Sequence, residues 1–262
     1  MSSNLFGPAI ALSLEVFGAL SGRAAVERVR AVGYGAVGIP AWRRDFAPET
    51  LGTSGARDLA AYLGKFSLAV SWLSAGRKGR FTVSSSVEED VDSLRAVIDL
   101  AARLRAPSMP PTAVVATVGA LGSADSAPAT NAREAISALA ADADGAGAIL
   151  ALAASEGEDA LLDDLLTGFG DAPVGRLVDP GAMLFSGRDP IAAAAASKRI
   201  AAVRASDSSA EEVNLAPGEG RVAWREFLAA LAVRDYHGYV TVEFAPRGDS
   251  NARAAQALGA MR

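Results

Sequence analysis

Hydrophobic residues recur along this chain with two alternating periods, which predict strands and helices in turn. Short apolar runs are typical of buried strands, and they alternate with longer segments whose apolar residues lie three or four positions apart. Near the C-terminus, residues 224–231 place Trp, Phe, Leu and Leu at helical spacing, and His237-Gly238 is predicted to end that helix because Gly tolerates a left-handed conformation. Residues 239–244 then predict a strand with Glu243 at its far end.

The whole chain is a series of such strand–helix units. The strands are predicted at 9–14, 36–39, 66–72, 107–118, 148–152, 174–178, 200–204 and 239–244, and the helices at 23–32, 48–63, 86–101, 131–143, 158–166, 189–196, 224–237 and 249–261. Alternation of this kind implies a parallel sheet with helical crossovers. Eight units in roughly 250 residues predict an α/β protein, a single (β/α)8 TIM barrel that occupies residues 1–262 as one domain. A doubly wound open sheet is the alternative, but residues 15–18 lack its GxGxxG loop.

Local signals at the predicted ends support several of these elements. Ser86 and Glu89 are spaced as a capping box, and Asp189 and Asp249 stand where side chains cap the starts of helices. Because Pro cannot sit inside a central strand, the strand within 107–118 is expected to begin after its Pro-Pro pair.

Composition narrows the class of protein. Hydrophobic residues make up 50% of the chain and charged residues 21%, which supports a large core. The net charge of −5 argues against general nucleic-acid binding, and the absence of cysteine excludes disulfides and thiolate metal sites. We find no run of about 20 apolar residues and no basic signal-peptide start, so the sequence predicts a soluble, cytoplasmic protein.

Five segments carry short motifs in a fixed order. They are VRAVGYGAV at 29–37, LVDPG at 177–181, RIAAVRASD at 199–207, PGEGRVAW at 217–224 and YVTVE at 239–243. Together they resemble the motifs of the xylose-isomerase-like barrels, a superfamily of sugar and sugar-phosphate isomerases and epimerases. The resemblance implies a TIM barrel with a divalent metal at its mouth. It also implies the metal ligands: a Glu after strand five, an Asp and a His around strand six, a His after strand seven and a final Glu.

This chain keeps only part of that implied ligand set. Asp179 and Glu243 match it, but Ala182 and Arg204 stand at the two histidine positions. The strand-five segment carries no carboxylate, and Gly38 stands where the family has a strand-two Glu. The positions at which this chain departs from the implied ligand set therefore bear on its chemistry as much as the positions that match.

Arginine in a ligand position changes the expected chemistry. Two carboxylates without an imidazole offer a metal few ligands, all of them hard oxygen donors. The fixed charge of Arg204 also repels a divalent ion. We therefore expect no metal and no other cofactor, with Mn, Mg or Zn disfavoured. Arg204 is expected to pair with Asp179, with Glu243 or with an anionic ligand. His237, the only histidine, is predicted at the opposite end of the barrel in a structural role.

Other candidate residues follow the predicted strands and are expected at the same end of the barrel. Glu15 follows the first strand, and Trp42 and Trp72 follow the second and third, where they would form an apolar wall for a ring or pack within the protein. Asp207 with Arg204 would bind a carboxylate or phosphate, or form an internal salt bridge. The strand-end loops also carry Arg43, Arg44, Arg77, Lys78, Arg80, Arg188 and Arg247. Arg77 and Arg247 in particular are candidates to steer an anionic substrate.

Three functions remain open from the sequence. The first is a divergent isomerase or epimerase that moves a proton beside a carbonyl without metal, with Glu243 and Asp179 as base and acid and Arg204 stabilising the oxyanion. The same groups suit a lyase or cyclase. The second is an inactive barrel that binds a small anion or a partner, and the third is a metal-dependent isomerase in which Glu15 joins Asp179 and Glu243. The expected partner is a small, anionic molecule, with no nucleic acid and no membrane; self-association is left open.

Overall fold

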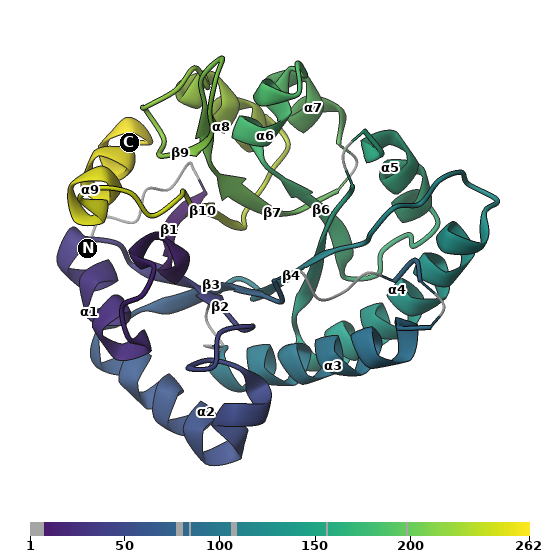
Figure 1. Ribbon diagram of the computed structural model, residues 1–262, viewed down its shortest axis with the longest axis horizontal. Helices are drawn as coiled ribbons and strands as arrows, with labels where there is room; N and C mark the ends of the chain where they lie inside the picture. The colour runs from purple at the N-terminus through teal and green to yellow at the C-terminus, as the bar shows by residue number, and fades with distance from the viewer. Residues whose placement is uncertain (1–7, 77–80, 84, 106–108, 156, 198) are drawn as a thin grey trace.

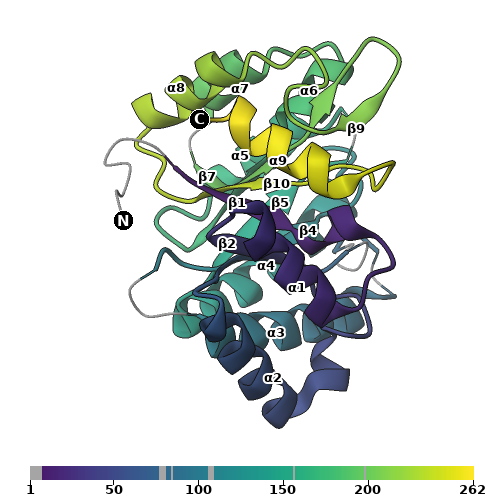
Figure 2. The same ribbon diagram turned by 90° about the vertical axis from the view of Figure 1, so that its left-hand side faces the viewer.

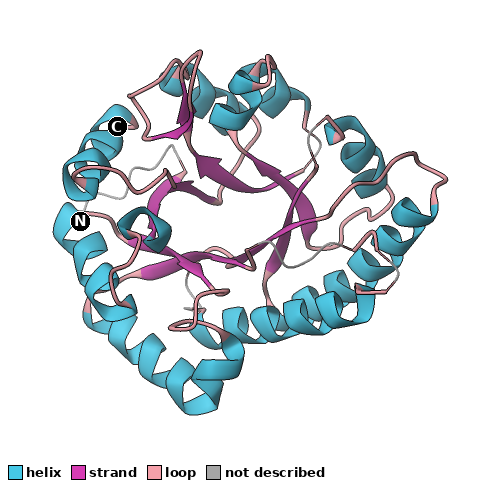
Figure 3. Cartoon of the chain, viewed as in Figure 1, coloured by secondary structure: helices cyan, strands magenta, loops and turns pink. Residues whose placement is uncertain are grey.

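The computed structural model describes residues 1–262 except 1–7, 77–80, 84, 106–108, 156 and 198. In the described part of the chain, eight parallel strands close into a barrel in the order β1-β10-β7-β6-β5-β4-β3-β2. Figure 1 looks down this barrel, and Figure 3 shows the ring of strands enclosed by helices. The predicted TIM barrel is confirmed.

The barrel strands run from Ala9 to Val242 and the helices lie between them. The barrel strands are β1 (Ala9–Ser13), β2 (Ala36–Pro40), β3 (Ala69–Ser74), β4 (Ala113–Thr117), β5 (Ile149–Ala153), β6 (Val174–Val178), β7 (Ile200–Ala205) and β10 (Tyr239–Val242). The helices are η1 (Leu14–Phe17, a 3-10 helix), α1 (Gly22–Val32), α2 (Pro48–Lys65), α3 (Val87–Leu104), α4 (Ala127–Ala146), α5 (Asp159–Thr167), α6 (Pro180–Phe185), α7 (Pro190–Ala196), α8 (Trp224–Val233) and α9 (Ser250–Ala260). A small antiparallel pair, β8 (Asp207–Ser208) and β9 (Val213–Leu215), follows β7.

Closure of the barrel depends on the pairing of its first and last strands. β1 pairs with β10 through four registered residues, from Ala9 with Tyr239 to Leu12 with Val242. Since all barrel strands are parallel, their carboxyl ends meet at one end of the barrel, which we call the mouth. Figure 2 shows the helices packed along the outside of the strands.

The interior of the barrel is filled mainly by small side chains. One buried cluster inside it consists of Trp72, Ala113, Val115, Ala151, Leu177, Ala201 and Ala202. Four of these seven residues are alanine, so the indole of Trp72 occupies space that no neighbour of its own size fills. The larger aliphatic and aromatic residues form a second core between strands and helices. No helix in the described part of the chain is both long and apolar enough to cross a membrane.

Several predicted boundaries are correct and others shift. β4 begins at Ala113, after the Pro-Pro pair as expected, whereas β3 lies two to three residues later than predicted. α4 is longer at both ends than predicted, because Ser126 caps it by accepting a hydrogen bond from the backbone N–H of Ala129. η1, α6 and the β8–β9 pair were not anticipated, since elements of two to six residues have too few positions to establish a period.

Two local predictions are wrong. The side chain of Ser86 makes no capping hydrogen bond to α3; its hydroxyl donates instead to the carbonyl of Val83, so the capping box does not form. α8 ends at Val233 rather than at His237-Gly238, and the residue with a left-handed conformation is Asp235. Short polar side chains tolerate that conformation, which is why glycine was not needed there.

The two cap positions provide a matched stability test. Asp189 accepts hydrogen bonds from the backbone N–H groups of Ile191 and Ala192, so Asp189→Ala is expected to lower the free energy of unfolding by about 1 kcal/mol. Ser86→Ala removes no cap and is expected to change it by less than about 0.5 kcal/mol. Urea denaturation of both variants measures the difference, and equal losses would contradict the assignment.

Candidate active site at the barrel mouth

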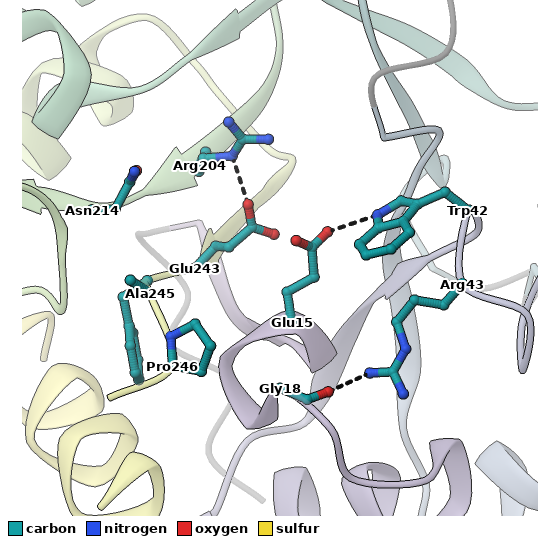
Figure 4. A pocket seen from close by; sticks show the side chains of 10 residues that line it. Glu15, Gly18, Trp42, Arg43, Arg204, Asn214, Glu243, Ala245 and Pro246 are labelled. Atoms are coloured by element: carbon teal, nitrogen blue, oxygen red, sulfur yellow. Dashed lines mark hydrogen bonds and ion pairs between the residues drawn. The ribbon is translucent and has the colours of Figure 1, made fainter. Parts of the chain in front are cut away.

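A cavity of about 640 Å³ opens at the mouth where the first and last strands meet. Its lining includes Glu15, Trp42, Arg43, Arg204, Asn214 and Glu243. We call it the Glu15 cavity, and Figure 4 shows these side chains converging on it. The volume is in the range that suits a small ligand.

Glu243 and Arg204 form the inner wall of this cavity. Arg204 Nε lies 2.9 Å from Glu243 Oε1, although the N–H is not aligned for a hydrogen bond. The second oxygen, Glu243 Oε2, is buried and accepts no hydrogen bond from any described protein atom. Arg204 is on β7 and Glu243 directly follows β10, its neighbour in the barrel, so the pairing of these strands sets the ion pair.

Glu15 reaches the same cavity from the opposite side. It lies in η1, directly after β1, and the hydroxyl of Ser13 accepts a hydrogen bond from its backbone N–H. The indole N–H of Trp42 donates to Glu15 Oε1 at 3.3 Å. In Figure 4 the carboxylates of Glu15 and Glu243 point toward one another. The site therefore brings two carboxylates face to face, with a cation beside only one of them.

This arrangement favours the neutral form of Glu15. Burial is the main cause that raises its pKa, and the charge of Glu243 adds to it; Trp42, Arg204 and Arg43 oppose the rise. The net effect raises the pKa of Glu15 to about 7. Glu15 thus holds a proton at a pH where an ordinary glutamate does not, which is the property of a general acid.

Asp179 lies on the other side of Arg204. It borders a second cavity of about 600 Å³, which we call the Asp179 cavity, while Arg204 lines both cavities. Asp179 Oδ2 is 3.9 Å from Arg204 Nη1, and Asp179 Oδ1 accepts hydrogen bonds from Ser206 and from the backbone of Ala182. The sequence left open whether Asp179 and Glu243 share a cavity; Arg204 stands between them.

Arg204 is a cation surrounded by acids. Burial alone lowers its pKa, but the charges of Glu243, Asp179 and Glu15 outweigh burial and raise the pKa above its ordinary value. Arg204 therefore keeps its charge. At about 4 Å and an effective dielectric constant near 20, each such pair is worth about 4 kcal/mol before desolvation is subtracted.

The donor set at this mouth does not suit a divalent metal. In the described part of the chain, no group of three or more His, Asp or Glu side chains is placed to hold an ion. The guanidinium of Arg204 lies near Asp179 and Glu243, the two carboxylates that match the implied ligand set, where it repels a metal. The residues present thus do not fit the metal site that the sequence resemblance implied.

Two other predicted site residues lie beneath or beside the site rather than in it. Trp72 is only 1% exposed and packs inside the barrel, with Arg204 Cζ 5.9 Å from its ring. Asp207 is fully buried. Its two oxygens accept four hydrogen bonds, from the backbone N–H groups of Ser208, Gly218 and Val222 and from the indole of Trp224. Asp207 thus anchors the loop between β7 and α8.

Three residues of the predicted basic rim, Arg43, Arg188 and Arg247, have partners within the chain. Arg43 donates to the carbonyls of Gly18 and Leu20 and pairs with Asp45. Arg188 pairs with Asp159. Arg247 pairs with Glu212, and the Arg247 side chain remains 56% exposed. Arg77, Lys78 and Arg80 lie outside the described residues. Trp42 does line the cavity, and its side chain is 49% exposed.

Sequence reasoning missed two residues of the mouth. Asn214 lines the Glu15 cavity with a left-handed backbone, and its carbonyl accepts a hydrogen bond from the backbone N–H of Ala245. Ser206 donates to Asp179 at 2.6 Å. Asn214 lies outside the five motif segments, and Ser206 lies within the segment 199–207 but matches none of the ligand positions implied there. For Asn214, the tolerance of asparagine for left-handed backbone is a signal that a sequence can carry.

The fold and the cavity define a class of protein: a TIM barrel with paired carboxylates at the carboxyl ends of its strands, where barrels of this kind place their active sites. The sequence matches the family described as the xylose isomerase-like TIM barrel over residues 26–262. The chain belongs to this family. None of the curated proteins matches it.

Solved structures with the same fold are distant in sequence. The 3-keto-D-glucoside 4-epimerase of E. coli has 13% identity and a TM-score of 0.77, over 97% of this chain and 99% of that one. L-ribulose 3-epimerase has 16% identity and a TM-score of 0.76, over 96% and 92%. The IOLI protein, described with a binding zinc atom, has 16% identity and a TM-score of 0.76, over 97% and 95%. At these identities the likeness establishes the fold alone.

The raised pKa of Glu15 predicts a pH-dependent stability. Because this pKa is higher in the folded state than the ordinary value of 4.5, the folded state binds more protons between about pH 4.5 and 7, and stability falls as pH rises through that range. Glu15→Gln removes this term. The free energy of unfolding of the variant relative to the native protein is expected to rise between pH 5 and pH 8 by on the order of 1–3 kcal/mol.

Urea denaturation at several pH values measures this difference. Glu49→Gln, on the exposed first turn of α2, serves as the control and is expected to track the native protein at each pH. A constant difference between Glu15→Gln and the native protein would contradict the raised pKa.

Proposed function

We propose that this protein is a metal-independent isomerase or epimerase that moves a proton beside the carbonyl group of a small hydroxylated substrate. The observation that carries the proposal is the facing pair of Glu15 and Glu243 in one cavity, one protonated near neutral pH and the other paired with Arg204. Unequal environments of two acids assign an acid and a base.

Each residue then has a chemical role. Glu243 is the base, and its carboxylate, which lines the cavity and is paired with Arg204, accepts a proton from the carbon beside the carbonyl. Glu15 is the acid, which supplies a proton to the carbonyl oxygen or back to the carbon. Arg204 lines the cavity and stabilises the negative charge that develops on the oxygen. Asp179 is a support for Arg204 in this scheme rather than the acid, because it borders the other cavity.

Membership of the family supports the reaction class. Two relatives in fold are named as epimerases, of a 3-keto-D-glucoside and of L-ribulose. Epimerisation at a carbon next to a carbonyl needs a base and an acid, and Glu243 and Glu15 are placed in one cavity to supply them. The same pair also suits a lyase or cyclase that begins by removing such a proton.

The position of the charges bears on the expected substrate. In the Glu15 cavity, Arg43 and Arg204 already have partners, and two carboxylates face the ligand. A neutral, hydroxylated carbonyl group fits this cavity better than an anion does.

A second candidate is a barrel that binds a small molecule without turnover. The observation that favours it is the pairing of Arg204 with both Glu243 and Asp179, because an internal ion network of this kind also suits a purely structural role. This candidate predicts ligand binding in the cavity and no proton exchange.

Exchange with solvent separates the two candidates. A panel of ketoses, keto-glycosides, sugar phosphates and keto acids is incubated with the protein in D2O, and deuterium incorporation is followed by NMR. We expect one class to exchange. Glu243→Gln and Glu15→Gln are each expected to slow that exchange by about 10²–10⁴-fold, and Glu49→Gln to leave it unchanged. Binding without exchange by the native protein would favour the second candidate.

Metal independence has its own test. The purified protein is expected to contain less than stoichiometric divalent metal by elemental mass spectrometry, and its exchange activity is expected to survive EDTA, because Arg204 already supplies the positive charge. One tightly held Mn or Zn ion per chain, or activity lost with EDTA and restored by metal, would overturn this part of the proposal.

A further inference from the structure

The centre of the barrel contains a contact that the proposed reaction does not use. Trp72 lies on β3 and is 1% exposed, and its ring is 5.9 Å from the guanidinium carbon of Arg204 on β7. A cation over an indole is stabilised by the electron-rich face of the ring, and tryptophan does this best of the aromatic residues. The indole therefore supports the same arginine that the carboxylates hold from their side.

The neighbouring strand is shaped to admit this indole. A Cβ atom at Gly38 on β2 would lie 2.4 Å from Trp72 Nε1 and 2.8 Å from Cδ1, closer than real Cβ atoms approach. It would also lie 3.0 Å from Cγ2 of Thr241 on β10. Only glycine at position 38 therefore lets Trp72 extend across the barrel interior.

The choice of tryptophan is not explained by packing alone. Trp72 Nε1 is a buried donor for which no described protein atom accepts a hydrogen bond, whereas an aliphatic or phenyl side chain would fill an apolar interior without that donor. Local conflicts of this kind are expected where function competes with stability.

We propose that Trp72 is a positioning residue. Gly38 leaves space for its indole, and the indole holds the guanidinium of Arg204 at the barrel mouth. There the guanidinium interacts with Glu243, Asp179 and Glu15 together. Without the indole, the guanidinium loses its support from below and moves toward the space among the alanines of the barrel interior. Its charge then moves away from the carboxylates at the mouth. The inference concerns the geometry of the site and stands whether or not the barrel catalyses the proposed reaction.

The side-chain Nε–H signal of Arg204 in ¹⁵N NMR provides a direct readout, followed from pH 5 to pH 9 in the absence of ligand. In the native protein this signal is expected to exchange slowly with water and to titrate with Glu15, near pH 7. In Trp72→Leu it is expected to exchange at least tenfold faster. Its titration midpoint is expected to move upward, since Arg204 is one of the groups that lowers the pKa of Glu15.

Gly38→Ala tests the same inference from a strand that does not carry Arg204. The added methyl group must displace Trp72, so the variant is expected to reproduce the faster exchange and the upward midpoint. In a Trp72→Ala background the same alanine is expected to add little further change, because both clashing atoms, Nε1 and Cδ1, are gone. If Trp72→Leu fails to fold, Gly38→Ala still decides the question.

Val115→Ala is the control for general loosening of the interior. Val115 belongs to the same buried cluster as Trp72, and its truncation is expected to lower stability without changing the Arg204 signal. A native-like Arg204 signal in folded Trp72→Leu or Gly38→Ala would overturn the proposal and make Trp72 a packing residue only. So would equal changes in Val115→Ala. Deuterium exchange of substrates, which tests the proposed function, is not needed for any of these outcomes.

Discussion

The mouth of this barrel is organised around one half-buried positive charge. Arg204 is surrounded by Glu243, Asp179 and Glu15, and each of these acids would be costly to bury without it. In an interior of low dielectric constant, removing one partner leaves an uncompensated charge, so the four residues hold together as a unit. The guanidinium of Arg204 lines two cavities at the mouth, one with Glu15 and Glu243 and the other with Asp159 and Asp179.

The barrel makes this arrangement possible by bringing distant segments together. Glu15 follows β1, Asp179 follows β6, and Glu243 follows β10, while Arg204 is on β7 itself. The closure of β1 onto β10 is the step that places Glu15 opposite Glu243. The same closure gives the two acids unequal environments, since only Glu243 lies close to the guanidinium.

The fold could be read from the sequence because alternating periods and eight units of similar length admit few other architectures. Glu243, Asp179 and Arg204 could be found because each ends or follows a predicted strand, where parallel strands bring their carboxyl ends together. The sequence alone could not show which of these residues share a cavity. The facing of Glu15 and Glu243 depends on strand register and barrel closure, and the different role of Asp207 depends on hydrogen bonds with backbone groups up to fifteen residues away.

Sequence pattern failed for physical reasons at the smaller features as well. Ser86 and Glu89 have the spacing of a capping box, yet the hydroxyl of Ser86 donates to the carbonyl of Val83 in the preceding turn, and its oxygen accepts no hydrogen bond from the start of α3. Trp72 ends a predicted strand, but Gly38 on the neighbouring strand has no side chain, which leaves space for the indole inside the barrel. In both cases a competing contact, which spacing along the chain does not record, decides where the side chain lies.

The buried carboxylate of Asp207 has a consequence for how a ligand would meet this protein. By accepting hydrogen bonds along the loop that follows β7, it fixes in advance the segment that presents Asn214 to the cavity. A wall assembled during folding need not be ordered again when a ligand arrives. The entropic cost of ordering this loop is thus incurred when the chain folds and not when a ligand binds. The loop is therefore a rigid wall of the cavity and not a closing lid.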